Sequence, residues 1–267
     1  MDSSVMATRQ NMLLAALSRA GFEGRHFKPI YMPLGDVINE PARLVNYIYF
    51  PTTAVLSVSS VMADGRTNAL TLIGREGFSG IEVFLGGDSA SCRAVVLSAG
   101  WGYQIRRELL DQECGQCGPM RTLLLRYAKS YIAQVAQTTV CNRHHVIDQQ
   151  LCRWLLMILD RQASNEVPLT HDRIAELIGV RRESVSQAAL ALKIAGCIRY
   201  QRGRISIVDR TGLETRTCEC YETVKRETYG PLEISQSAKV AAARAATDCI
   251  HIRRLEHARE HASPSYA

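Results

Sequence analysis

The sequence predicts an α+β protein in which a β-rich N-terminal domain is followed by a long helix and a mainly helical C-terminal domain. Three observations favour this organisation: short apolar runs between turn signals in residues 28–107, an apolar helical repeat after Pro119, and two further helical segments that end in a hairpin. A length of 267 residues favours two domains over one.

The N-terminal β structure is indicated by apolar runs at residues 47–50, 54–58, 69–73 and 94–97. Turn signals recur every 8–12 residues between such runs, and Asp64-Gly65 marks the clearest hairpin because glycine supplies the positive φ of a tight turn. Even spacing of this kind predicts a sandwich or barrel rather than βαβ units.

The predicted long helix carries two apolar rows. The first contains Leu125, Ala128, Ile132, Val135 and Thr139, and the second contains Met120, Leu124, Tyr127 and Tyr131. Two rows give the helix two surfaces to bury. One surface covers the β domain, and the other either meets its own copy across a homodimer axis or is covered within a monomer.

After a helix expected at residues 146–161 and a loop at 163–168, residues 169–187 match the steric pattern of a helix-turn-helix. Thr170 is a suitable N-cap. Ala175 is small where two helices cross, and Gly179 is free to end the first helix. Val185 provides an inward apolar side chain in a second helix that starts two or three residues after the glycine.

A β-hairpin is predicted directly after these helices, over residues 198–208, with its turn at Gly203. Arg202 and Arg204 lie at the tip, where a winged helix contacts the phosphate backbone of DNA. The stretch from Arg181 to Arg204 contains six basic residues and one acidic residue, within a chain of net charge +6. This local excess favours a nucleic-acid partner over a merely solvated surface.

With Arg182-Glu183-Ser184-Val185 in the second helix, the chain resembles the Crp/Fnr family of bacterial transcriptional regulators over roughly residues 28 to 210. The resemblance implies a cyclic-nucleotide-binding-type jelly roll, a homodimer formed through the long helix, double-stranded DNA as ligand and RNA polymerase as a further partner. It also implies that Arg182 and Glu183 read base edges in the major groove, where arginine pairs with guanine and glutamate accepts from cytosine.

Two positions depart from the common family pattern. Gln187 stands where many members have a second arginine, and glutamine favours adenine. Arg181 replaces a capping serine and is expected to contact phosphate. Ser184 and Ser186 are either exposed hydroxyls or DNA contacts. The expected DNA-binding residues are Thr170, Arg181, Arg182, Glu183, Ser184, Ser186, Gln187, Arg202 and Arg204.

The effector site of the family matches this chain poorly. Phe78 stands where cyclic-nucleotide-binding members have a carboxylate that accepts a hydrogen bond from the ribose. A phenylalanine has no acceptor, so the ribose hydroxyl of cyclic AMP would be buried there without a partner. Arg93 falls at the phosphate position and is either an effector ligand or a structural arginine paired with Glu76, Glu82 or Asp88. The effector stays unassigned, and no cofactor is expected.

The cysteines leave a second interpretation open, a thiol-redox or small-molecule sensor with secondary DNA binding. Cys114 and Cys117 have redox-motif spacing but are also compatible with a structural pair. Cys218 and Cys220 form a metal site only with partners that the sequence does not identify, and the pair at 144–145 is expected to be a hinge or cap. No cysteine precedes Cys92, which excludes an N-terminal iron–sulfur cluster. No metal site is therefore predicted.

Other function classes find no support. The chain has no Walker loop, nucleophile elbow or zinc-protease motif, so neither catalytic residues nor an enzymatic activity are expected. It has no run of 18 apolar residues and no recognisable export signal, which predicts a cytoplasmic protein. We expect a β domain at 1–113, a dimerisation helix at 114–145, a winged helix-turn-helix at 146–229 and a disordered or loosely helical tail at 230–267.

Overall fold

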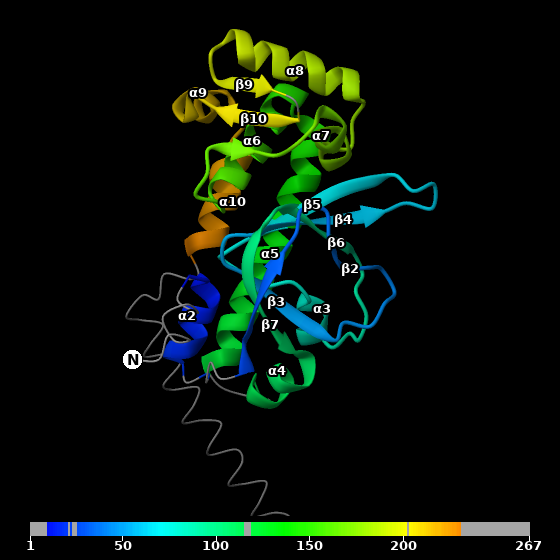
Figure 1. The fold of residues 1–267 in the computed structure, drawn as a ribbon, viewed down its shortest axis with the longest axis vertical. Helices are drawn as coiled ribbons and strands as arrows, with labels where there is room; N and C mark the ends of the chain where they lie inside the picture. The colour runs from blue at the N-terminus through cyan, green and yellow to red at the C-terminus, as the bar shows by residue number, and fades with distance from the viewer. Residues whose placement is uncertain (1–9, 21, 23–25, 115–118, 202, 231–267) are drawn as a thin grey trace, which may run out of the picture.

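The computed structural model describes residues 10–20, 22, 26–114, 119–201 and 203–230. The long helix α5 (Pro119–His144) runs through the middle of the molecule, with the β domain along one part of it, the last helix, α10, packed against it, and the helix-turn-helix beyond its end (Figure 1). The predicted α+β class is confirmed. The tail expected from residue 231 onward lies outside the described residues.

Two antiparallel sheets form the N-terminal domain. One has the order β1-β7-β3, with β1 (Lys28–Met32), β7 (Gly100–Arg106) and β3 (Tyr47–Pro51). The other has the order β2-β6-β4-β5, with β2 (Val37–Asn39), β6 (Arg93–Ser98), β4 (Val55–Val61) and β5 (Thr67–Ile73). All four predicted apolar runs are strands, and the hairpin at Asp64-Gly65 is confirmed, with Gly65 at φ 83°.

Short helices complete this domain: α2 (Met12–Arg19), α3 (Ile81–Phe84) and α4 (Arg107–Cys114). Asn11 caps α2 by accepting from the Leu14 amide at 2.9 Å. The apolar face of α2 joins a core that α5 closes with Leu124 and Tyr127. The second predicted row of the long helix therefore covers the β domain, as expected.

The C-terminal domain is built on α6 (Ile147–Leu159), which is buried over most of its length. Its other elements are β8 (Glu166–Val167), α7 (His171–Ile178), α8 (Arg182–Ile194), β9 (Ile198–Gln201), β10 (Arg204–Ile207), α9 (Arg210–Arg216) and α10 (Cys220–Tyr229). The expectation of a plain loop at 163–168 was wrong, because Val167 pairs with Ile205 and adds a third strand to the wing. Helices α9 and α10 were not predicted from the sequence.

The two domains touch where the β4–β5 hairpin meets the helix-turn-helix (Figure 1). Strand β5 lies beside α7, and a Cβ on Gly179 would come within 2.9 Å of the Asn68 side-chain oxygen. The orientation of the DNA-binding region therefore depends on contacts with the β domain as well as on the α5–α6 connection. No helix in the described part of the chain combines the length and apolarity that a bilayer span requires.

Candidate nucleic-acid interface

The helix-turn-helix is assembled from α7, Gly179 and α8. The Thr170 hydroxyl caps α7 by accepting from the Arg173 amide at 3.2 Å. Gly179 ends α7 in the left-handed region at φ 77°, which a glycine adopts without the strain that a Cβ introduces. Ala175 and Val185 are buried where the two helices cross. The residues singled out for the turn thus occupy the predicted positions.

The first turn of α8 presents polar side chains to solvent. Arg181 is its N-cap residue and makes no side-chain capping bond, whereas Arg182, Glu183 and Gln187 lie on the exposed face. The Nε atom of Arg182 lies 3.3 Å from an Asp172 carboxylate oxygen, and both side chains are mostly exposed. An exposed pair of this kind contributes about 0–1 kcal/mol, so it holds Arg182 only weakly.

Ser186 has a partner inside the protein. Its hydroxyl lies 3.0 Å from Nδ1 of His171, and the His171 ring stacks on Tyr200 with 4.3 Å between ring centroids. This cluster connects α7, α8 and strand β9. Burial lowers the pKa of His171 from its usual value, and the neighbouring Arg182 guanidinium lowers it further. Ser184, on the same helix, is half-buried, as Ser186 is.

The wing lies beside this helix pair. Gly203 forms its turn at φ 77°, and Arg204 Nη1 lies 2.8 Å from a Glu166 carboxylate oxygen on β8. Both side chains of this pair are at least half exposed, so Arg204 is available to a stronger anionic ligand such as phosphate. Arg202, the other predicted wing residue, lies outside the described residues.

Comparison with known proteins agrees with this geometry. Residues 149–216 match the Crp-like helix-turn-helix domain. FixK2 from Bradyrhizobium japonicum superposes with a TM-score of 0.62 at 16% identity, covering 72% of this chain and 98% of that one. The chain has the fold of a Crp/Fnr transcriptional regulator.

Two further structures share this Crp/Fnr fold. A Crp/Fnr-family regulator from Eubacterium rectale gives a TM-score of 0.59 at 16% identity, covering 76% of this chain and 93% of its own. A CRP-family regulator from Thermus thermophilus gives a TM-score of 0.58 at 20% identity, and the match covers 71% of this chain and 95% of that one. No curated protein sequence matches this chain. At these identities the likeness establishes the fold and not the ligand of the β domain.

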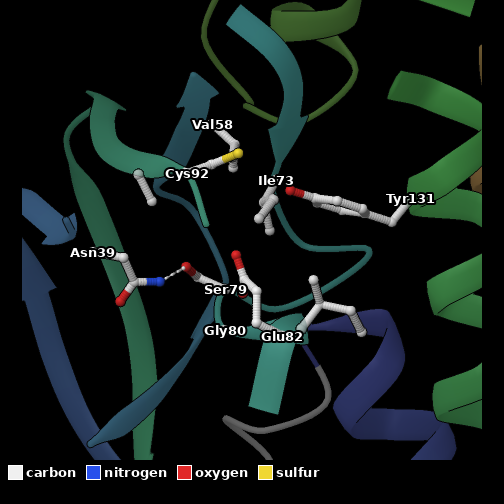
Figure 2. A pocket seen from close by; sticks show the side chains of 10 residues that line it. Asn39, Val58, Ile73, Ser79, Gly80, Glu82, Cys92 and Tyr131 are labelled. Carbon is white, nitrogen blue, oxygen red and sulfur yellow. Dashed lines mark hydrogen bonds between the residues drawn. The ribbon is translucent and has the colours of Figure 1, made fainter. Parts of the chain in front are cut away.

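The β domain contains a small cavity beside α5. Asn39, Ser79, Glu82 and Cys92 line a cavity together with Tyr131, which reaches in from α5 (Figure 2). The cavity has a volume of about 10 Å³, which is room for about one water molecule. Burial raises the pKa of both Cys92 and Tyr131, so each stays protonated at neutral pH. Neither supplies charge for an effector.

The two residues that the family resemblance selected in this domain lie elsewhere. Phe78 is fully buried and stacks on Phe50 at 5.3 Å between ring centroids, so it is a core residue. Arg93 does not line the cavity, and its Nε atom lies 3.0 Å from a carboxylate oxygen of Glu40. The partners expected for a structural Arg93 were Glu76, Glu82 and Asp88, and Glu40 was not among them. Glu40 directly follows β2, and it reaches Arg93 because β2 pairs with β6, a pairing that the sequence does not reveal.

The predicted cysteine pairs have different outcomes. Cys117 and the side chain of Cys114 lie outside the described residues, so the thiol-redox interpretation stays a prediction. Cys218 and Cys220, in contrast, lie beside two residues at the end of α5, Cys141 and His145. Neither partner was predicted from the sequence, because about 75 residues of chain separate the two halves of this cluster.

Proposed function

We propose that this protein is a dimeric, sequence-specific DNA-binding transcription regulator that reads an inverted repeat through α8. The observation that carries the proposal is the exposed face of the first two turns of α8, which presents Arg182, Glu183 and Gln187 from a helix supported by α7 and the wing. These three side chains have the donors and acceptors that distinguish base pairs in the major groove. Ser184 lies at the edge of the same face.

Residues around this reading face supply the contacts to the DNA backbone. Thr170 and Arg181 begin the two helices of the motif, and Arg204 lies on the wing. Arg202 is assigned to the same role from the sequence. Contacts to phosphate orient the protein but carry no sequence information. Ser186 contributes indirectly, since its hydroxyl is engaged by His171.

The dimer is proposed to form through α5. The first apolar row of this helix leaves Leu125 47% and Ile132 59% exposed, and Val140 is 48% exposed one turn from the end of the helix. Leu125 and Ile132 are seven residues apart, which is the spacing that pairs helices in a coiled coil. A second copy of α5 covers this row and places two reading helices about 34 Å apart, in successive major grooves.

The β domain is proposed to act without cyclic AMP. The small cavity beside Tyr131 and the buried position of Phe78 both oppose a nucleotide at the usual family position. Regulation of transcription further implies contact with RNA polymerase, a cytoplasmic location and no enzymatic activity, as the family resemblance suggests.

The test is selection of bound fragments from random duplex DNA at about 0.15 M salt, with and without cyclic AMP. We expect one palindromic motif that is enriched equally under both conditions. Enrichment only with cyclic AMP would show that the pocket opens for the nucleotide. If no motif is enriched under either condition, the basic surface binds nonspecifically and the sensor interpretation gains weight.

A further inference from the structure

A cluster of three cysteines and one histidine lies at the junction between the long helix and the DNA-binding domain. Cys141 and His145 are one turn apart at the end of α5, and Cys218 and Cys220 flank the start of α10. The three cysteines are buried and His145 is half-buried. All four potential ligand atoms lie within 4.8 Å of one another.

The spacing of these atoms matches a tetrahedral zinc centre. Zinc bonds of about 2.3 Å to sulfur and about 2.0–2.1 Å to nitrogen place neighbouring ligand atoms about 3.6–3.8 Å apart. The sulfurs of Cys141 and Cys218 are 3.6 Å apart, and the Cys220 sulfur is 3.5 Å from Nδ1 of His145. Iron–sulfur clusters need more widely separated thiolates, because several iron atoms lie between them.

Outer contacts orient two of the four ligands. Nε2 of His145 lies 3.3 Å from a Glu219 carboxylate oxygen, so the ring directs Nδ1 toward the cluster. The side-chain amide of Gln137 donates to the Cys220 sulfur at 2.9 Å. A carboxylate on the second nitrogen of a histidine and hydrogen bonds to ligand atoms are typical of bound metal sites.

A buried cation beside the cluster gives an independent argument. Arg153 is fully buried on α6, where it contacts the Thr138 hydroxyl, the Met157 sulfur and the Trp154 ring. Among the described residues it has no carboxylate ion pair. Its guanidinium also interacts electrostatically with Cys141, Cys218 and Cys220. A buried charge requires a compensating charge. Three thiolates and one imidazole around Zn²⁺ have a net charge of −1, which balances Arg153.

We propose that Cys141, His145, Cys218 and Cys220 bind one structural Zn²⁺ ion per chain. Binding releases the thiol protons to solvent and forms three zinc–sulfur bonds and one zinc–nitrogen bond. With four protein ligands the coordination shell is closed, so the ion is structural and not catalytic. The ion would fasten α10 to the end of α5, where the chain turns into the DNA-binding domain.

The test uses the full-length protein purified anaerobically with a reductant and without chelators. We expect one zinc per chain by mass spectrometry of the metal content. X-ray absorption at the zinc edge should then show three sulfurs at about 2.3 Å and one nitrogen at about 2.0–2.1 Å. This measurement needs no variant. Absence of zinc, even after incubation with zinc chloride, would overturn the proposal, as would a coordination shell without sulfur.

Variants locate the site within the chain. His145→Ala and Cys218→Ser should each lose most of the bound zinc, whereas Cys92→Ser, at a half-buried cysteine in the β domain, should keep it. Retention of zinc in both cluster variants would contradict the assignment. A Cys141–Cys218 disulfide in the anaerobically purified protein would contradict it as well, since that bond removes two of the ligands.

Discussion

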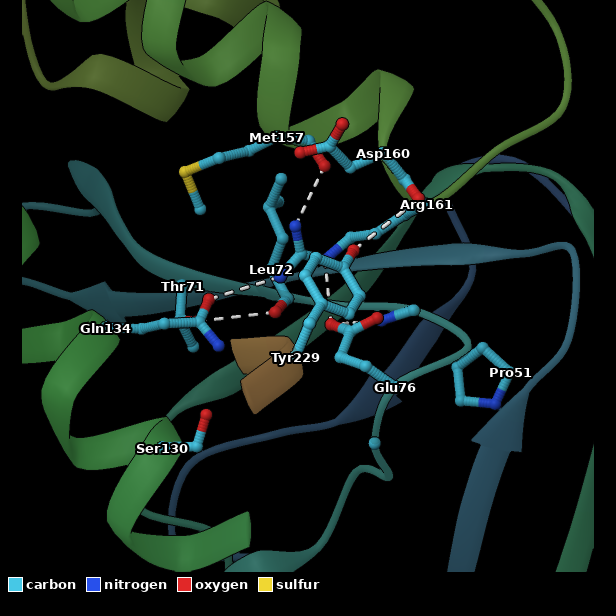
Figure 3. Close-up of polar contacts among 12 residues, drawn as sticks. Pro51, Thr71, Leu72, Glu76, Ser130, Gln134, Met157, Asp160, Arg161 and Tyr229 are labelled. Carbon is cyan, nitrogen blue, oxygen red and sulfur yellow. Dashed lines mark hydrogen bonds and ion pairs between the residues drawn. The ribbon is translucent and has the colours of Figure 1, made fainter. Parts of the chain in front are cut away.

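The Nε atom of Arg161, at the end of α6, lies 2.8 Å from a carboxylate oxygen of Glu76 in the β domain, and both side chains are almost fully buried. Further bonds surround the pair (Figure 3). Arg161 donates to the Met157 carbonyl at 2.8 Å and to the Gln134 side-chain oxygen at 3.3 Å, and that oxygen also accepts from the Thr71 hydroxyl at 2.8 Å. This ion pair and the hydrogen bonds of Gln134 thus connect the β domain, the long helix and the DNA-binding domain.

Substitution Glu76→Gln should strongly destabilise the protein. It leaves the Arg161 charge buried without its counter-charge, and breaking one side of a buried ion pair costs about 3–5 kcal/mol. The free energy of unfolding in urea measures this loss. Glu176→Gln is the control, because its pair with Arg173 is exposed and is expected to contribute within about 1 kcal/mol. Equal effects of the two substitutions would show that the buried pair has no special role.

Glu183→Ala should relax the DNA specificity at one base pair in each half-site. Loss of a carboxylate that accepts from a cytosine amino group costs about 1–3 kcal/mol of discrimination. Selection from random DNA measures the change. Glu108→Ala removes an exposed glutamate from α4 in the β domain and should leave the motif unchanged. An unaltered motif in the Glu183 variant would mean that another residue reads this base.

Arg204→Ala should weaken DNA binding evenly across sequences, since a phosphate contact does not distinguish bases. The slope of log K against log salt concentration should become shallower by about one unit for each protomer bound, which is about two units for the proposed dimer. Binding titrations at several salt concentrations, with both the selected site and a scrambled duplex, measure both effects. A loss confined to the selected site would assign Arg204 to base reading.

Local patterns in the sequence predict most of the DNA-binding region. The N-cap at Thr170 and the turn at Gly179 depend on neighbouring residues, so a short window suffices to predict them. Strand β8 is different: it has two residues and exists because Val167 pairs with Ile205 across the domain. A two-residue strand has no periodicity of its own, and so the sequence analysis assigned it to a loop.

The cluster of three cysteines and one histidine likewise depends on contacts between distant segments, which the sequence alone does not predict. Cys218 and Cys220 are recognisable as half of a site, but the other half comes from α5, and only the packing of α10 on α5 joins them. At the end of α5, Cys141 and His145, the first residue after the helix, have the four-residue spacing of neighbours on one helix face. That spacing is the one local signal, and it indicates a site only when a second pair of ligands is known.

His171 should make the stability of the DNA-binding domain depend on pH. Its pKa is lowered in the folded protein, mainly by burial and then by Arg182, whereas an unfolded histidine titrates near pH 6.5. As the pH falls below about 6.5, the unfolded chain therefore binds a proton that the folded chain does not, and stability decreases. Above that pH both states are neutral, and this residue adds no dependence.

His171→Phe should remove this part of the pH dependence while keeping a ring against Tyr200. Urea unfolding of both proteins between pH 7.5 and 5 checks it, and the wild-type free energy of unfolding should fall more steeply than that of the variant. Parallel curves would show that His171 does not couple protonation to folding. The comparison concerns slopes, so a constant loss from the missing Ser186 contact does not affect it.

Ile132→Asp should convert the proposed dimer to a monomer. Ile132 is 59% exposed at the middle of α5, so the chain alone tolerates a charge there, but a second copy of the helix would bury that charge against its own counterpart. Sedimentation equilibrium measures the mass. Leu34→Asp is the matched control, since Leu34 is 53% exposed but lies in the turn between β1 and β2. Because the two reading helices act together on an inverted repeat, the monomer should also bind a full site no more tightly than a half-site. A dimer that persists in the Ile132 variant would place the interface on another surface.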